Sequence, residues 1–220
     1  MSARAFTVID VEQRSPEWFA ARLGRVTSTA ADALLSKGRN GDESAGRRNL
    51  RVRLALERVT GRTVEDNSHQ TRAMQAGAEA EPAAVALYEA ATGLIIQRTG
   101  FLSHNALMAG TSLDGHVGDF AGLVEIKSPL PATHLDYLRT GTIPTDYMRQ
   151  VIHALWLTGA EWCDWMSYSP AFPDELQTKI VRVSRAGVDL AAYDAELRRF
   201  LAEVDALAAD VLEMAERGAA

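Results

Sequence analysis

The chain has 220 residues, of which 47% are hydrophobic and 24% are charged, and its formal net charge is −6. This composition is typical of a globular protein with a sizeable core, and no apolar run approaches the roughly 20 residues that cross a bilayer. The first residues lack the apolar stretch of a secretory signal, and a single cysteine, Cys163, excludes an internal disulfide. We therefore expect a cytoplasmic protein without a membrane partner.

The charges are distributed unevenly along the chain. Residues 22–62 carry ten basic and four acidic side chains, whereas residues 189–216 carry eight acidic and two basic ones. A polyanion could therefore meet a positive surface while the acidic end faces away. Two solvated helix faces explain the same pattern, so charge alone does not establish nucleic-acid binding.

Helices dominate the first part of the chain. Ser15 and Pro16 predict a helix start, because serine caps helices and proline fits the first helical position, and Gly24 predicts its end. A glycine-containing basic loop is expected at residues 37–42. Further helices are predicted over residues 30–35, 45–60 and 70–92.

Strands are predicted in the second part of the chain, mixed with helices. The strand-like runs are residues 94–102, 107–113, 123–127, 162–168 and 178–183. Helices are predicted over residues 132–138 and 147–157, and a long amphipathic helix from about 188 to 216. No repeat, linker or change of composition divides the chain. We therefore expect one α/β domain over residues 1–220, with a central mixed β-sheet flanked by helices.

Three charged residues lie on or beside two of these strands. Asp114 follows the run 107–113, while Glu125 and Lys127 are two residues apart on the next run and therefore point to the same face. Residues 116–122 between them predict a turn or short hairpin, so pairing of the strands would place Asp114 beside Glu125. Two carboxylates and an amine at one point favour a divalent-cation site for phosphodiester hydrolysis. An ordinary solvated strand face is the alternative.

Glu81 is a candidate third acid. It falls on the apolar stripe of the 70–92 helix, which also contains Met74, Ala78, Val85 and Tyr88. A carboxylate on such a stripe is costly unless it is paired or bound to a cation. Contact with solvent at the edge of the stripe and pairing with an arginine are two explanations, but together with Asp114 and Glu125 a shared cation is the better one.

Six segments occur in a specific order between Trp18 and Pro170. They are Ala21–Ser28, Gly77–Glu81, Ser112–Gly115, Leu123–Pro129, Tyr147–Val151 and Tyr168–Pro170. In this order and spacing the chain resembles the PD-(D/E)XK nuclease superfamily, in particular the phage lambda exonuclease family of viral-type recombination exonucleases. The resemblance implies a restriction-endonuclease-like core. Leu113 replaces the proline that names the motif, at a position that shapes the strand end and binds no metal.

The resemblance assigns catalytic roles to residues of these segments. It implies that one or two Mg2+ or Mn2+ ions are held by Asp114, Glu125, Glu81 and the backbone carbonyl of Ile126. Lys127 then orients or deprotonates the attacking water, or stabilises charge on the phosphate. Gln150 lies on the following helix and is implied to be a positioning group.

The resemblance also assigns contacts with DNA. Arginines and helix N-termini bind phosphate well, and the family pattern places the terminal 5′-phosphate on Arg22, Thr27 and Thr29. Pairing of Arg22 with a nearby carboxylate is the alternative. Arg39 corresponds to a position that reaches into duplex DNA, and Met74 to an apolar position near the active-site opening. None of the five histidines has the spacing of a metal cluster.

The implied function is a metal-dependent exodeoxyribonuclease that digests linear double-stranded DNA 5′ to 3′ to mononucleotides and leaves a 3′ single strand for recombination. The family further implies a homotrimer around the DNA, a single-strand annealing partner, and a phage or prophage gene in a bacterial cell. One alternative is a structure- or single-strand-specific endonuclease of the same superfamily. Another is a catalytically inactive DNA-binding or scaffold subunit.

Overall fold

The computed structural model describes residues 4–64 and 72–218, and for residues 72–76 and 78 it describes only the backbone. The α-helices are α1 (Pro16–Arg22), α2 (Ala31–Leu35), α3 (Ala45–Thr60), α4 (Arg72–Thr92), α5 (Pro131–Thr140), α6 (Thr145–Thr158) and α7 (Leu190–Gly218). Three short 3-10 helices are η1 (Ser28–Ala30), η2 (Asp174–Leu176) and η3 (Arg185–Gly187). In the described ranges, no helix is both long and apolar enough to cross a membrane.

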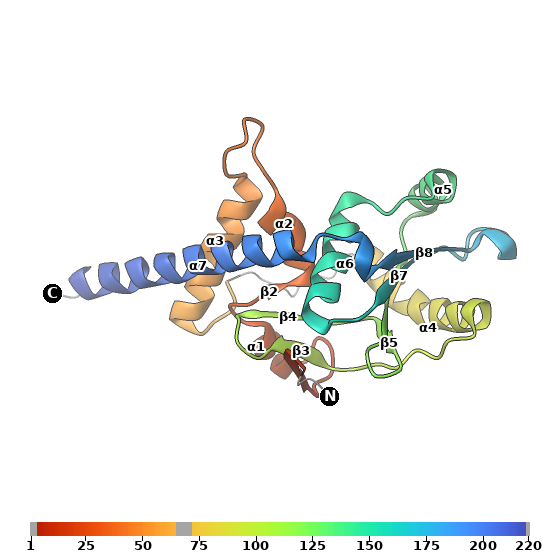
Figure 1. Cartoon of the computed structure of the whole chain (residues 1–220), viewed down its shortest axis with the longest axis horizontal. Coiled ribbons are helices and arrows are strands. Elements are labelled where there is room, and N and C mark those ends of the chain that lie inside the picture. Colours follow the sequence, from red (N-terminus) through yellow and green to blue (C-terminus); the bar gives the residue numbers. More distant parts are fainter. Residues whose placement is uncertain (1–3, 65–71, 219–220) are drawn as a thin grey trace.

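The strands form two four-stranded mixed sheets flanked by helices (Figure 1). Their bounds are β1 (Phe6–Ile9), β2 (Val26–Thr27), β3 (Phe101–His104), β4 (Ala109–Thr111), β5 (Gly115–Val117), β6 (Gly122–Lys127), β7 (Trp162–Tyr168) and β8 (Thr178–Ser184). The first sheet has the order β1-β3-β4-β2 and the second β5-β6-β7-β8, with one parallel pair in each, β2/β4 and β6/β7. The predicted α/β class is confirmed, with the strands divided between two sheets instead of one.

The second sheet is covered on both faces. Val124 and Ile126 of β6 pack with Tyr88 of α4 in one apolar cluster. Leu123 packs with Leu155 of α6 in another. Because strand side chains alternate, the odd-numbered residues of β6 face the α6 side of the sheet. Burial on both faces fixes the register of β6, since a slip by one residue would exchange its two sets of side chains.

The strand prediction for residues 94–102 is wrong over most of its length. Only Phe101–His104 forms a strand, β3, and before it Gln97 makes an isolated bridge to His116 of β5. Leu94 and Ile96 are apolar because they pack in the cluster that contains Tyr88 of α4, whereas Ile95 between them is exposed. Strands β1, β2 and β5 were not predicted, because they are too short for a periodic pattern to identify them. The turn expected at residues 116–122 is shorter, since β5 takes up residues 116 and 117 and β6 begins at Gly122.

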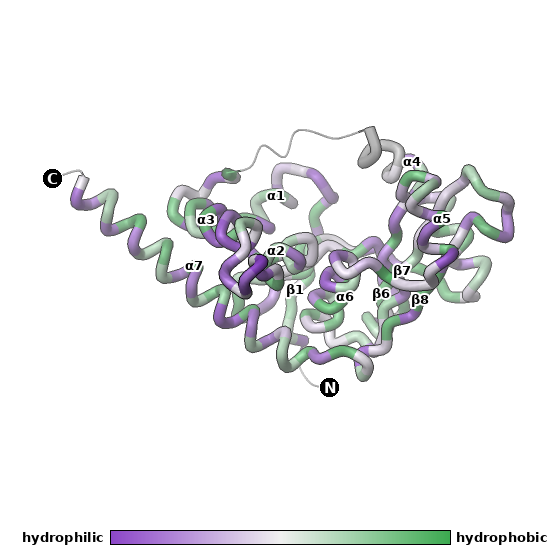
Figure 2. The backbone as a smooth tube through the Cα atoms, turned by 90° about the horizontal axis from the view of Figure 1, so that it is seen from above, coloured by the Kyte–Doolittle hydropathy of each residue, from purple (hydrophilic) through white to green (hydrophobic). Residues whose placement is uncertain are grey.

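The acidic C-terminal helix does not face away from the basic segment. Arg47 of α3 donates to Glu203 at 2.6 Å and to Glu196 at 3.2 Å, both on α7. Arg58 forms a further ion pair with Asp205, at 2.5 Å. The expectation of a separate acidic end is therefore wrong for the first part of α7, where the two charge runs neutralise each other. The last turns of α7 extend beyond the body of the molecule (Figures 1 and 2).

Candidate active site

Strand pairing places Asp114 opposite Glu125. In the antiparallel pair β5/β6, Gly115 is the register partner of Val124, and Asp114 directly precedes β5. The Ile126 N–H donates a 2.7 Å hydrogen bond to Oδ2 of Asp114, which fixes this carboxylate against β6. Asp114 and Glu125 are thus neighbours, as expected. The strand that pairs with β6 is β5, however, and not the 107–113 run that was expected to do so.

Lys127 completes the group on β6. Its Nζ lies 2.5 Å from Oε1 of Glu125, and both side chains are largely buried. The same ammonium lies 5.2 Å from the ring centre of Tyr147 on α6, a cation–π contact. Burial alone would lower the pKa of Lys127, but the carboxylates of Glu125 and Asp114 outweigh it and raise the pKa. In the protein alone, Lys127 therefore keeps its proton.

The electrostatic cost of this arrangement is that the buried Asp114 carboxylate is destabilised in its charged form. Burial is the main cause that raises the pKa of Asp114 to about 7, and the charge of Glu125 adds to it, while Lys127 and the Ile126 N–H oppose the shift. A divalent cation bound between the two carboxylates would remove this cost. Among the described residues, no three acidic, histidine or cysteine side chains form a complete metal cluster. Two carboxylates fit a hard cation such as Mg2+, which keeps several waters and takes substrate oxygens as its other ligands.

Glu81 lies beside this group but points to a different partner. It lines a cavity of about 500 Å³ together with Asp114, and its charge also contributes to the raised pKa of Asp114. Its Oε1 is paired with Nη2 of Arg98 at 2.8 Å. The arginine pair that the sequence left open is therefore present, and the role of Glu81 as a metal ligand stays a prediction.

Gln150 occupies the helix that covers the Lys127 side of the sheet. It is half-buried on α6, three residues after Tyr147 and so on the same helix face. The contact between Tyr147 and Lys127 shows that this face is turned toward β6. Sequence reasoning missed Tyr147, although an aromatic residue one turn before the candidate glutamine was a usable signal.

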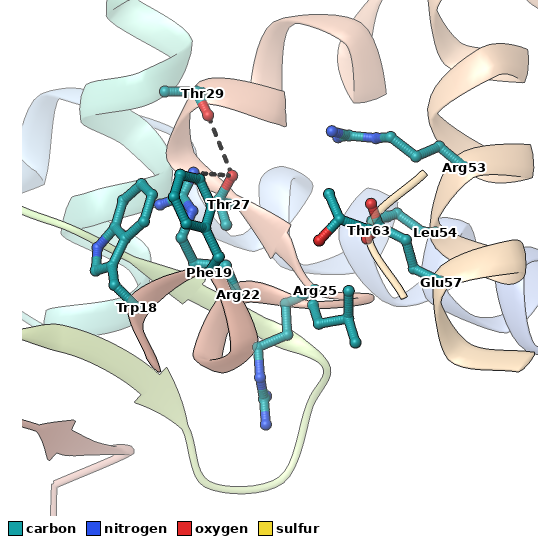
Figure 3. Close-up of a pocket in the computed structure, with 11 residues that line it drawn as sticks. Trp18, Phe19, Arg22, Arg25, Thr27, Thr29, Arg53, Leu54, Glu57 and Thr63 are labelled. Atoms are coloured by element: carbon teal, nitrogen blue, oxygen red, sulfur yellow. Dashed lines mark hydrogen bonds between the residues drawn. The ribbon is translucent and has the colours of Figure 1, made fainter. Parts of the chain in front are cut away.

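A second candidate site surrounds Arg22. The side chains come from α1, the segment after it and α3, and they line a cavity of about 190 Å³ (Figure 3). The guanidinium of Arg22 lies 4.0 Å from the Trp18 ring, and its Nη2 donates to Oγ1 of Thr27 at 3.5 Å. The hydroxyls of Thr27 and Thr29 are 3.1 Å apart. The three residues that the sequence assigned to the 5′-phosphate thus lie at one cavity.

The charge at this cavity is positive. The pKa of Arg22 is lowered to about 10, mainly by burial and also by the charge of nearby Arg53, while Glu57 opposes the shift. In the described part of the chain, the hydrogen bonds of Arg22 go to the hydroxyls of Ser112 and Thr27 and not to a carboxylate. A desolvated arginine with neutral partners favours an anionic ligand. Sequence reasoning missed Arg53, which its place in the basic segment could have indicated.

Two candidates remain, Arg39 and Met74. Arg39 is exposed in the loop between α2 and α3, where a bridge between Lys37 and Glu43 closes the loop. Figure 1 shows that this loop projects from the body. Met74 belongs to the first turns of α4, but its side chain lies outside the described residues. Both assignments stay predictions.

Comparisons with known proteins add independent findings. A family model for the YqaJ-like viral recombinase domain matches residues 17–161. The crystal structure of an alkaline exonuclease, LHK-Exo, from Laribacter hongkongensis is similar at 35% identity and a TM-score of 0.82, covering 92% of this chain and 99% of that one. Its complex with dAMP is similar at 36% identity and a TM-score of 0.81, with the same coverage.

A more distant structure shares the fold alone. A phage-related exonuclease from Haemophilus somnus is 13% identical, with a TM-score of 0.64, and covers 86% of this chain and 96% of that one. No curated protein sequence matches the chain significantly.

Proposed function

This chain belongs to the YqaJ-like viral recombinase family of lambda-exonuclease-like proteins, and on that premise we propose that it is a Mg2+-dependent exodeoxyribonuclease. It digests linear duplex DNA 5′ to 3′ to mononucleotides and leaves a 3′ single strand for recombination. The observation that carries the proposal is the pairing of Asp114 opposite Glu125, with the ammonium of Lys127 on the same strand. The dAMP complex of the relative supports a mononucleotide product.

The proposed chemistry follows from the two carboxylates and the lysine. Asp114 and Glu125 hold the cation, and Glu81 and the Ile126 carbonyl are further candidate ligands. A divalent cation supplies an activated water and offsets charge on the phosphate when it is bound. Lys127 keeps its proton on Nζ in the protein alone, which supports a role in stabilising phosphate charge or orienting the water. Gln150 is proposed to position groups from the α6 side.

The 5′ polarity rests on the cavity around Arg22. A terminal phosphate carries more charge than an internal one and exposes more acceptor oxygens. The guanidinium of Arg22 and the hydroxyls of Thr27 and Thr29 supply donors for such a group. A homotrimer around the duplex and a single-strand annealing partner are proposed from the family alone. Arg39 and Met74 are proposed as further DNA contacts on the same basis.

The substrate class can be tested with two forms of one plasmid. The protein is incubated with 5′-phosphorylated linear duplex and with closed circular plasmid, each with Mg2+ or with EDTA. We expect loss of the linear form alone, in Mg2+ alone, with mononucleotides as the products. Cutting of the circle would indicate an endonuclease, and no cleavage of either form would favour a DNA-binding subunit.

The end preference depends on Arg22. We expect Arg22→Gln to lower the ratio of cleavage rates on 5′-phosphorylated and 5′-hydroxyl duplexes by about tenfold or more, because one charge-assisted contact to the phosphate is lost. Arg25→Gln is the matched control. Arg25 lines the same cavity, but its guanidinium donates to the Leu107 carbonyl and points away from the threonines (Figure 3). The same ratio in Arg22→Gln as in the wild type would remove Arg22 from end recognition.

A further inference from the structure

One arginine lies on the wall of the cavity beside Asp114. The cavity is lined by the acids Asp10, Glu12, Glu81 and Asp114, and Arg98 is the basic residue among the described residues that line it. A DNA strand that reaches Asp114 through this cavity passes acidic side chains. A cation on the wall is therefore well placed to contact a phosphate of that strand.

The backbone on both sides of Arg98 is held in place. Gln97 exchanges two main-chain hydrogen bonds with His116 of β5, at 2.8 and 2.9 Å. On the other side, Gly100 approaches the end of β1 so closely that an added Cβ would lie 2.1 Å from the Ile9 carbonyl oxygen. The backbone of Arg98 is thus fixed beside the cavity, while its side chain is 61% exposed and has room to change its partner.

The partner of Arg98 is the candidate third acid. Its Nη2 lies 2.8 Å from Oε1 of Glu81, and the two side chains are 61% and 30% exposed. Exposed ion pairs contribute little to stability, so this one is easily exchanged for another. The guanidinium occupies Oε1 of Glu81 and offsets the charge of this carboxylate, so it weakens the binding of a divalent cation to Glu81.

On the basis of the proposed function, we propose that Arg98 is a substrate-positioning residue that exchanges partners. It holds the Glu81 carboxylate while DNA is absent and moves to a phosphate oxygen of the DNA strand when that strand enters the cavity. Glu81 is then free to take part in binding the divalent cation. Arginine suits this exchange because its planar guanidinium binds carboxylate and phosphate with the same geometry. DNA and cation therefore assist each other at this site.

The first test measures Mn2+ binding without DNA by titration calorimetry. We expect Arg98→Gln to bind Mn2+ about threefold more tightly than the wild type, because the competing guanidinium is gone. In a Glu81→Gln background the same substitution should leave Mn2+ affinity unchanged, which separates exchange at Glu81 from a general change of charge. Arg217→Gln is the control, since Arg217 forms a similar exposed pair with Glu213 at 2.6 Å on α7.

The second test measures binding of a 5′-phosphorylated duplex in Ca2+ by fluorescence anisotropy, which does not depend on cleavage. We expect Arg98→Gln to raise the dissociation constant about tenfold and, with Mg2+, to raise KM while kcat changes less than about twofold. Unchanged Mn2+ affinity, or unchanged DNA affinity, would overturn the exchange. Failure of the wild type to cleave DNA would overturn the proposed function instead, while the two binding measurements would still decide the role of Arg98.

Discussion

Replacement of Lys127 by alanine is expected to lower the cleavage rate of linear duplex DNA by about 1000-fold or more. The ammonium lies 2.5 Å from Glu125, and its charge interacts with that of Asp114, so it is in direct contact with one proposed cation ligand and close to another. Removal of one such group from a reacting centre typically costs two to four orders of magnitude, as it does for other charge-stabilising donors and general acids and bases (about 10² to 10⁴). The rate is measured on 5′-phosphorylated duplex in saturating Mg2+.

Two controls separate chemistry from folding and binding. Duplex binding in Ca2+ should change by less than about twofold, because the Arg22 cavity is untouched. Lys179→Ala removes another lysine, from strand β8, and should cleave DNA like the wild type. Lys127→Ala also leaves Glu125 without its cationic partner, so the melting temperature of this variant must be recorded with Mg2+ present. Normal turnover in this variant would exclude Lys127 from the reaction.

Asp114→Asn is expected to abolish both cleavage and the stabilisation of the protein by Mn2+. The neutral side chain can still accept the hydrogen bond from the Ile126 N–H, so the local backbone should be preserved. The asparagine lacks the negative charge of Asp114, which is repelled by Glu125 in the absence of a cation. It therefore also lacks the charge that a bound cation would compensate. In EDTA the variant should therefore melt at or above the wild-type temperature. Ligand at 100 times its dissociation constant contributes about 2.7 kcal/mol to the free energy of unfolding, and this gain should be lost.

Thermal melting with and without Mn2+ checks this expectation. Asp119→Asn is the control, because Asp119 lies in the same hairpin but is 83% exposed and pairs with Arg4. That variant should keep the full Mn2+ effect. A persistent Mn2+ shift in Asp114→Asn would mean that the cation binds elsewhere in the protein.

The elements that could be predicted are those whose pattern comes from local physics. Pro16 and Ser15 mark the start of α1, and the strand predicted at 162–168 coincides with β7. Segments that depend on a distant partner could not be predicted in the same way. Leu94 and Ile96 are apolar because they pack against α4, and no local signal distinguishes such packing from strand pairing. The division into two sheets likewise depends on pairings between segments far apart in the chain.

The candidate site shows the same limit. Alternation along β6 correctly placed Glu125 and Lys127 on one face, and the register of β5 put Asp114 opposite. The partner of Glu81 depends on Arg98, seventeen residues away on an irregular segment, and the sequence left it open. The ion pairs between α3 and α7 could not be predicted either. The two charged segments lie more than 100 residues apart, and the sequence does not indicate that they are in contact.

Because the Ile126 N–H holds the Asp114 carboxylate, the geometry of the candidate centre depends on how β5 and β6 are aligned. The distance between its two acids is determined by how many residues lie in the connection from β5 to β6, where Gly118 and Phe120 adopt positive φ angles near 59°. Substitutions in this connection change a side chain, whereas the gain or loss of one residue moves Asp114 out of line with Glu125. Related chains that remain active should thus keep the number of these residues constant and vary most at exposed positions such as Asp119.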